Sequence, residues 1–236
     1  MSFRGVVVVA GANSATARAL ARRFAGESVS LALFSRDKEK LLRFREELSL
    51  PPERTLIEAF DFREADSASQ AAALVKEKFQ GCDVLVNLIG GWIGGKSIDA
   101  FEPADYALML EQHFWTTLHL VRAFLPLLRL SRCGRVFVVS SPTAALPPAN
   151  NAPYSVAKAA QEALMLALAQ EAKGSSLTAN VLRVTAIDVE GLRDRKPSEK
   201  TAGRTTPEEI AETIFFLCSE AANKINGARI PLYGSP

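Results

Sequence analysis

The chain has 236 residues, 48% of them hydrophobic, and a formal net charge of only +2 at pH 7. The hydrophobic content is enough for a large core and argues against a disordered protein. The balanced charge gives no reason to expect a nucleic-acid or membrane partner. We expect a single domain over residues 1–236.

The cysteines and histidines form a poor set of metal ligands. Cys82, Cys133 and Cys218 are far apart in the sequence, and the chain has only two histidines. We therefore expect no metal site. A low, odd number of cysteines is typical of a reducing compartment. The sequence before Val6 lacks the pattern of a secretion signal, and no apolar segment approaches the roughly 20 residues of a membrane helix. We expect a cytoplasmic protein.

Short β-branched segments alternate with longer helical patterns along the chain. In chain order we expect strands at 6–10, 29–34, 55–60, 84–87, 135–140, 177–184 and 228–232. Between them we expect helices at 14–26, 38–48, 67–79, 103–130, 154–173 and 207–219. Continuous apolar strands indicate burial on both faces, and strand-helix repetition is typical of a doubly wound sheet. The predicted fold class is α/β with a Rossmann-type parallel sheet of about seven strands. The segments 90–99 and 190–206 are candidate mobile loops.

A turn of small residues follows the first predicted strand. Its sequence, Ala10-Gly11-Ala12-Asn13-Ser14-Ala15, opens the first predicted helix. Such a turn lets backbone N–H groups approach a pyrophosphate, and the helix dipole favours the negative charge. Gly11 would form the tight turn, and Asn13, Ser14 and Ala15 would lie beside the phosphates. The same pattern also begins helices in α/β proteins that bind no nucleotide, so alone it decides nothing.

The end of the second predicted strand favours one nicotinamide cofactor over the other. In dinucleotide folds an acid at this point binds the ribose 2′-hydroxyl, whereas an Arg accommodates a 2′-phosphate. Here Ser35 stands where the acid is expected, and Arg36 follows it. This favours NADP(H) over NAD(H). Asp37 comes next and keeps NAD(H) possible.

A tyrosine and a lysine form the candidate catalytic pair. Tyr154 and Lys158 are four residues apart and project from one face of a helix. An ammonium beside a phenol lowers the pKa of the phenol, which could then exchange a proton with a carbonyl or alcohol oxygen. Ser141, at the end of the fifth predicted strand, could hydrogen-bond the same oxygen. A bare Tyr-x-x-x-Lys pattern arises easily by chance, but these residues follow strand ends, which border the ligand crevice in such sheets.

Several segments together resemble the short-chain dehydrogenase/reductase family over essentially the whole chain. The family's Tyr-x-x-x-Lys motif falls on Tyr154 and Lys158, and its serine falls on Ser141. Its Asp-Val-Leu-Val-Asn-Asn-Ala-Gly segment falls on Asp83–Gly90. Further matches are Leu125-Pro126, Pro207–Ala211 and Ile225-Asn226-Gly227.

The resemblance implies further residues at a cofactor site. Its acid that contacts adenine falls on Asp61, which Phe62 follows, and its strand-end segment contributes Asn87 and Gly90. By the same alignment Ile187 would lie beside the nicotinamide carboxamide. The family's catalytic asparagine, which holds a water in a proton relay, aligns with His113. An imidazole could also relay a proton, but a histidine packed inertly in a helix remains an equal alternative.

The chain departs from the family pattern at a few positions. Two of the three motif glycines are replaced, by Ala15 and Ala17, and the family's Pro-Gly after the sixth strand becomes Val184-Thr185. A methyl group at Ala15 could push the pyrophosphate outward. These departures leave open a catalytically silent dinucleotide-binding sensor or scaffold. An isomerase or lyase that uses the same tyrosine is a third possibility.

The resemblance also implies partners. The substrate would be a small carbonyl compound or alcohol. Its pocket could be lined by Trp92, Ile93, Pro147, Leu192 and the 190–206 loop, although each of these could equally be ordinary loop packing. An apolar stripe from Phe114 to Leu125 and a largely apolar segment, Ala157–Ala169, are consistent with buried core. Their outer faces could pair two subunits, which would give a homodimer or homotetramer. The leading hypothesis is an NADP-dependent oxidoreductase in which Tyr154 acts as general acid/base.

Overall fold

The computed structural model describes residues 3–48 and 50–233, and its centre is a parallel sheet of seven strands. The strand order is β3-β2-β1-β4-β5-β6-β7, and every neighbouring pair is parallel. The predicted doubly wound α/β fold is therefore confirmed. The strands are β1 (Arg4–Ala10), β2 (Ser28–Ser35), β3 (Thr55–Ala59), β4 (Val84–Asn87), β5 (Arg135–Ser140), β6 (Thr178–Arg183) and β7 (Arg229–Pro231).

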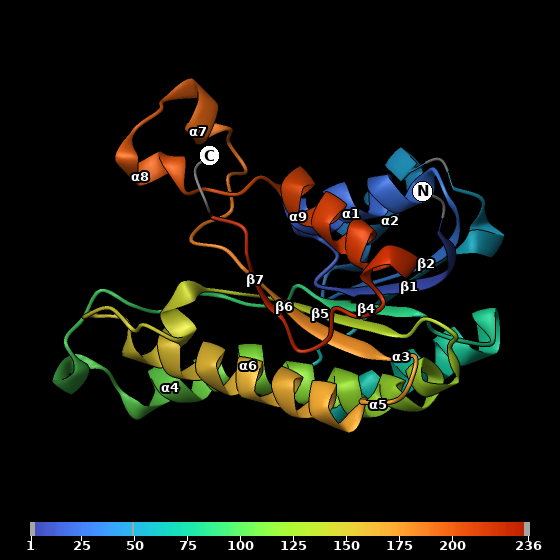
Figure 1. Ribbon diagram of the computed structural model, residues 1–236, viewed down its shortest axis with the longest axis horizontal. Helices are drawn as coiled ribbons and strands as arrows, with labels where there is room; N and C mark the ends of the chain where they lie inside the picture. The colour runs from blue at the N-terminus through green and yellow to red at the C-terminus, as the bar shows by residue number, and fades with distance from the viewer. Residues whose placement is uncertain (1–2, 49, 234–236) are drawn as a thin grey trace.

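Helices cover both faces of the sheet (Figure 1). One face carries α1 (Ala15–Ala25), α2 (Lys38–Leu48) and α9 (Pro207–Leu217). The other carries α3 (Ala65–Phe79), α4 (Pro103–Leu110), α5 (Thr116–Leu130) and α6 (Ala152–Glu171). A lobe that stands apart from these layers holds α7 (Leu192–Arg195) and α8 (Glu199–Ala202). The 190–206 segment, expected as an irregular loop, thus contains two short helices. Short 3-10 turns lie at Pro52–Arg54, Ile98–Ala100, Pro142–Ala144 and Glu220–Ala222.

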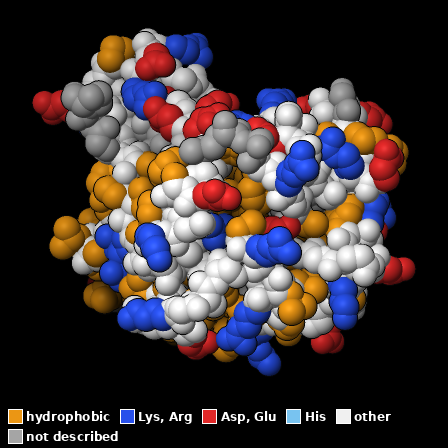
Figure 2. Space-filling model, turned by 45° about the vertical axis from the view of Figure 1, so that its right-hand side comes forward, with side chains coloured by type: hydrophobic (Ala, Val, Ile, Leu, Met, Phe, Trp, Pro, Cys, Tyr) orange, Lys and Arg blue, Asp and Glu red, His pale blue; other side chains and the backbone are white. Residues whose placement is uncertain are grey.

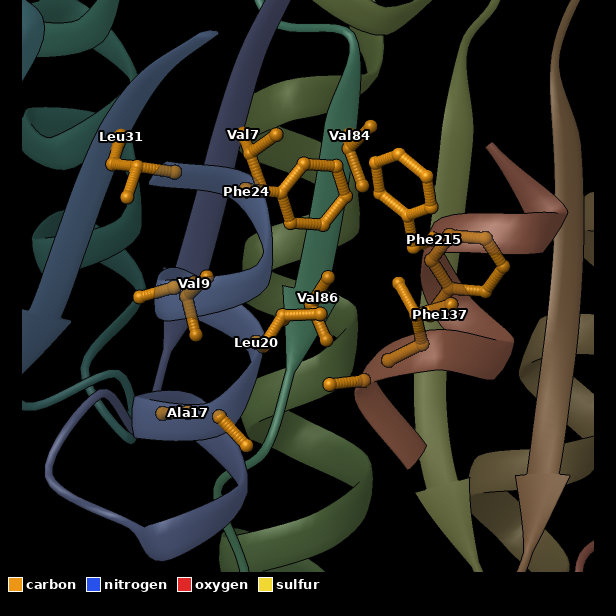
Figure 3. Packing of buried hydrophobic residues seen from close by; sticks show 14 of the residues in the cluster. Val7, Val9, Ala17, Leu20, Phe24, Leu31, Val84, Val86, Phe137 and Phe215 are labelled. Carbon is orange, nitrogen blue, oxygen red and sulfur yellow. The ribbon is translucent and has the colours of Figure 1, made fainter. Parts of the chain in front are cut away.

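The strands are buried on both faces, as their continuous apolar sequence predicts. Side chains alternate along β1, so that Val7 and Val9 face α1 and α9 while Val8 faces the opposite helices. Figure 3 shows Val7 and Val9 packed with Phe24 of α1 and Phe215 of α9. The two phenyl rings meet edge to face with centroids 5.4 Å apart. Two apolar layers therefore hold the sheet rigid beneath the loops at its ends.

The long helix expected over 103–130 is interrupted. A π-helical turn, Glu111–Trp115, separates α4 from α5. Immediately after it the hydroxyls of Thr116 and Thr117 donate back to the carbonyls of Gln112 and His113, at 2.8 and 2.6 Å. Such bonds compete with the helical hydrogen bonds, and π-turns often occur at functional sites. The sequence pattern did not reveal the interruption because the apolar positions continue through it.

The topology places a crevice at one edge of the sheet. The chain builds outward from β1 to β3, then returns to add β4 on the other side of β1. In open α/β sheets ligands bind at such a reversal, outside the carboxyl ends of the strands. In the part of the chain described, no helix combines the length and apolar character needed to cross a membrane.

Candidate active site

Two adjoining cavities form a continuous cleft at the carboxyl edge of the sheet. The outer cavity has a volume of about 680 Å³ and the inner one about 280 Å³. The two cavities adjoin because they share four lining residues, Ser14, Leu88, Ile89 and Gly90. Among the residues predicted for a cofactor site, the outer cavity is lined by Gly11, Asn13, Ser14, Ser35, Arg36, Asp61, Phe62 and Gly90. The inner cavity is lined by His113, Tyr154, Lys158 and Ile187 from the predicted set.

The turn after β1 has the geometry that a phosphate-binding turn requires. Gly11 has a φ of +83°, and a Cβ there would lie 2.8 Å from the backbone carbon of Leu88. Only glycine fits this left-handed, crowded position. Ser14 caps α1 by accepting a hydrogen bond from the N–H of Ala17 at 3.2 Å. The first N–H groups of a helix have no partner within its backbone, and Ser14, which lines both cavities, places the start of α1 at their junction.

The end of β2 forms the far wall of the outer cavity. Ser35 is buried, and its hydroxyl accepts a hydrogen bond from the side-chain amide of Asn13 at 2.6 Å. Arg36 is exposed at the rim. The carboxylate of Asp37 lies 3.1 Å from the ammonium of Lys40. A hydrogen bond from the backbone N–H of Lys40 is the main cause that lowers the pKa of Asp37.

Asp61 lines the outer cavity, but its carboxylate already has a partner. The guanidinium of Arg63 donates to both carboxylate oxygens, with Nε 3.0 Å from each. This bidentate contact lowers the pKa of Asp61. The Phe62 side chain is buried and packs against the ring of Phe34 at 6.1 Å. Phe62 therefore forms the floor of this end of the cleft.

Tyr154 lies in the first turns of α6 and lines the inner cavity. Burial raises the pKa of Tyr154, and a hydrogen bond with the Ser141 hydroxyl partly opposes this effect. The sequence instead predicts a phenol whose pKa is lowered by Lys158. In this structure burial is the larger influence and the pKa is raised, while the Lys158 ammonium lies 5.8 Å from the centre of the phenol ring. At neutral pH Tyr154 therefore keeps its proton.

Lys158 is buried beneath the cleft. Its ammonium donates to the carbonyl of Val139 at 2.7 Å and to the side-chain oxygen of Gln161 at 3.0 Å. Burial lowers the pKa of Lys158 to about 7, and the carboxylate of Glu162 only partly opposes this. That carboxylate is engaged by Arg183 and Arg229 at 2.5 and 2.7 Å. The lysine is thus held mainly by neutral oxygens.

His113 lies on the π-helical turn, against Tyr154. The two rings meet edge to face with centroids 5.5 Å apart, and Nε2 of the imidazole lies 3.0 Å from the carbonyl of Gly91. Burial lowers the pKa of His113 to about 3, and the nearby Lys158 ammonium acts in the same direction. The imidazole is therefore neutral at physiological pH. It can accept one hydrogen bond and donate another, but it carries no proton beyond its single N–H.

Three residues of the predicted set line neither cavity. Ser141 is buried beside Tyr154 and contacts it directly. The side chain of Asn87 donates to the Thr117 hydroxyl at 2.9 Å and accepts from the N–H of Ile89 at 3.0 Å, so it shapes the turn that lines both cavities. Ala15 lies on the outer side of α1, at a separate cavity.

The loops proposed for a substrate pocket are joined to one another. The indole N–H of Trp92 donates to the side chain of Asn151 at 2.9 Å, and the N–H of Gly95 donates to the carbonyl of Asn150 at 2.6 Å. Trp92 itself is 64% exposed. Pro147 is exposed, and Ile93 and Leu192 are half-buried. The described part of the molecule does not place these apolar residues around one closed cavity.

Sequence reasoning missed two side chains at the site. Lys40 lines the outer cavity from the first turn of α2, and its spacing after Arg36 could have indicated it. Gln161 is 1% exposed and contacts Lys158. A glutamine among the apolar residues of α6 was a signal, since buried amides need partners.

Comparisons with known proteins agree with this geometry. A sequence profile of the family described as short chain dehydrogenase matches residues 5–200. The uncharacterized oxidoreductase YvrD of Bacillus subtilis is 26% identical over 245 residues, which cover 94% of this chain and 92% of the relative. The BbsC subunit of a hydroxy(phenyl)methyl-succinyl-CoA dehydrogenase from Thauera aromatica is 26% identical over 235 residues, 97% of this chain and 93% of BbsC.

A solved structure of the same family has the same fold. The crystal structure of a short-chain dehydrogenase/reductase from Brucella melitensis, described as a glucose/ribitol dehydrogenase, superposes with a TM-score of 0.85 at 27% identity. The match covers 98% of this chain and 97% of that one. The chain therefore belongs to the short-chain dehydrogenase family. It is an oxidoreductase of that family, a dehydrogenase or reductase.

Proposed function

We propose that the enzyme transfers a hydride between NADP(H) and a carbonyl or alcohol substrate, with Tyr154 as general acid/base. The observation that carries this proposal is the continuity of the cleft. Tyr154 and Lys158 line its inner cavity, which adjoins an outer cavity with Ser35 and Arg36 at its far end. A nicotinamide dinucleotide bound along the cleft would place its redox ring at the tyrosine and its adenosine half at the arginine.

The side chains of the inner cavity suit the reduction of a carbonyl. When bound, the nicotinamide cofactor supplies the hydride for reduction or accepts it in the reverse reaction. Tyr154 holds a proton on its hydroxyl and would donate it to the carbonyl oxygen. The Ser141 hydroxyl, beside the phenol, would hydrogen-bond the same oxygen. The Lys158 ammonium would stabilise the phenolate that remains, and the N–H that has no partner among the described residues would hold a ribose hydroxyl of the cofactor.

The charge pattern of the outer cavity favours NADP(H). Ser35, which is neutral and buried, stands where an acid would bind the ribose 2′-hydroxyl. Arg36, Lys40 and Arg63 supply positive charge around the cavity, and Asp61 is held by Arg63. Asp37, which kept NAD(H) possible, is paired with Lys40. A dianionic 2′-phosphate would therefore meet two cations, Arg36 and Lys40.

The substrate is proposed to be an uncharged carbonyl compound or the corresponding alcohol. No residue from Val136 to Ala157, the segment that carries Ser141 and Tyr154, is charged. Leu146 of this segment and Trp92 of the facing loop are exposed apolar side chains. Figure 2 shows apolar surface gathered below the projecting lobe.

We also propose how the subunit assembles and where it is located. Val121 and Phe124 of the predicted apolar stripe are buried within the subunit, whereas Trp115 at the start of the stripe and Val156 of α6 are exposed. Pairing of these exposed faces would give the homodimer or homotetramer expected from the family resemblance. The three cysteines are free thiols in the structure, which is compatible with the proposed cytoplasmic location.

The proposal is tested by the substitution Tyr154→Phe. Removing the hydroxyl removes the proton donor, so NADPH oxidation with a panel of ketones and aldehydes should fall by about 10²- to 10⁴-fold. Affinity for NADPH, followed by tryptophan fluorescence, should stay unchanged. Tyr106→Phe is the matched control, since Tyr106 lies on α4, packs against Phe101 and lines neither cavity. A Tyr154→Phe enzyme with undiminished turnover would overturn the assignment, and a wild type that binds NADPH but reduces nothing would favour a sensor.

A further inference from the structure

A chain of buried hydrogen bonds runs from Lys158 away from the cleft, and Gln161 is its centre. Gln161 lies on α6 one turn after Lys158 and is 1% exposed. Its side-chain oxygen accepts from the Lys158 ammonium at 3.0 Å. Its side-chain nitrogen donates to the Thr117 hydroxyl at 2.9 Å and to the His113 carbonyl at 3.2 Å. Every polar atom of this amide has a protein partner.

The chemistry of these partners fixes the orientation of the amide. A backbone carbonyl only accepts, so the nitrogen of Gln161 must face His113. An ammonium only donates, so the oxygen must face Lys158. The Thr117 hydroxyl uses its own hydrogen in a 2.6 Å bond to the His113 carbonyl and accepts from both Gln161 and Asn87. The network therefore joins α6 to the π-helical turn and to the end of β4.

We propose that Gln161 is a positioning residue for Lys158. This role rests on the function proposed above. Gln161 would act on the catalytic pair, Tyr154 and Lys158, without touching the substrate. With the Val139 carbonyl and Gln161 each taking one N–H of the ammonium, the third N–H is left for the cleft. An amide oxygen accepts a hydrogen bond but does not take up a proton. The lysine therefore exchanges its proton only on the cleft side.

The neutrality of this amide also matters for the charge of Lys158. The titratable groups that face the lysine are Tyr154 and Glu162 on α6 and His113 on the π-helical turn. The carboxylate of Glu162 is shared by Arg183 and Arg229 from β6 and β7, which reduces its effect on the lysine. From β5, the contact is the neutral carbonyl of Val139. A carboxylate at position 161 would add a direct counter-ion.

The test measures the titration of Lys158 directly, by NMR of protein with ¹³Cε-labelled lysine, with Lys158→Met to identify the signal. In the wild type the pKa should lie near 7. Gln161→Glu places a negative charge against the ammonium and should raise that pKa by at least about 1. Gln161→Met keeps the volume but removes the acceptor, and it should lower the pKa. In turnover assays Gln161→Met should reduce kcat more than it raises KM for NADPH.

The matched control is Gln170→Glu, the same substitution on the exposed face of α6. It should leave the Lys158 titration unmoved, and circular dichroism checks that each variant is folded. Either Gln161 variant suffices if the other fails to fold. Equal Lys158 pKa values in wild type and variants would show that Gln161 does not hold the ammonium. A shifted pKa in a protein without carbonyl turnover would overturn the proposed function and leave the role of Gln161 standing.

Discussion

The two ends of the sheet differ in how fully their buried polar groups are hydrogen-bonded, although Ser219 Oγ at the amino end also has no partner among the described residues. At the amino end, the guanidinium of Arg135 is 1% exposed and donates to the carbonyls of Gly134, Ser176 and Leu217 and to the side chain of Asn223. At the carboxyl end, Asn13 Oδ1, Gln112 Oε1 and His113 Nδ1 are buried without a partner among the described residues. Buried polar atoms are normally satisfied, so unmet ones in a cleft point to a ligand.

A single motif spans both ends. Asp83 precedes β4 and accepts from the N–H of Val6 at 2.7 Å and from the hydroxyl of Ser131 at 2.5 Å. A Cβ on Gly5 would collide with its carboxylate. Asn87, at the other end of β4, shapes the turn beside the cleft. The comparison teaches that Asp83 ties the start of the strand to its neighbours, whereas Asn87 at its end shapes the turn that lines the cleft.

The largest effect on stability is expected from Arg135→Met. The substitution removes the donor from the buried Leu217 carbonyl at the end of α9 and from the Ser176 carbonyl and the Asn223 side chain, which belong to exposed residues. The Gly134 carbonyl keeps the N–H of Thr178. An unpaired buried acceptor costs about 1–3 kcal/mol, so the free energy of unfolding should fall by on the order of 2–3 kcal/mol. Urea denaturation measures this. If the amino end serves stability alone, the folded variant should bind NADPH with wild-type affinity.

Arg135→Lys is the control for charge. It keeps the positive charge near the carboxyl end of α9 but lacks the planar fork, so its stability should lie between those of wild type and Arg135→Met. A folded Arg135 variant with weakened NADPH affinity would contradict the separation of the two ends. It would show that the amino end of the sheet also affects binding in the cleft.

A smaller effect, confined to the cleft, is expected from Arg36→Ala. Loss of the guanidinium should weaken NADPH binding about tenfold, which corresponds to about 1.4 kcal/mol, and leave NADH binding nearly unchanged. Fluorescence titration with each cofactor measures the ratio of the affinities for NADPH and NADH. Lys38→Ala is the control, because Lys38 pairs with Glu58 outside the cleft. Equal losses for NADPH and NADH would contradict the assignment of Arg36 to the 2′-phosphate.

The sequence predicted the sheet and most of the cleft because both rest on local patterns. Strands such as β1 and β4 are continuous apolar segments, and Gly11, Tyr154 and Lys158 belong to short motifs. The missed features depend on segments far apart in the chain. Gln161 becomes important only when α6 packs against the π-helical turn, 48 residues earlier. The raised pKa of Tyr154 likewise reflects burial, which no spacing of residues displays.

The smallest effect is expected from Ala15→Gly, which restores a glycine of the family motif. The Ala15 methyl belongs to the first turn of α1 and lines a cavity of about 300 Å³ with Arg18, Thr206 and Pro207, outside the cleft. Its removal should therefore change NADPH affinity less than about twofold and cost at most about 1 kcal/mol of stability. The same substitution at Ala25, in the last turn of α1, is the matched control. A tenfold gain in NADPH affinity for Ala15→Gly alone would mean that the methyl obstructs the pyrophosphate, and Ala15 would then join the residues shaped around the ligand.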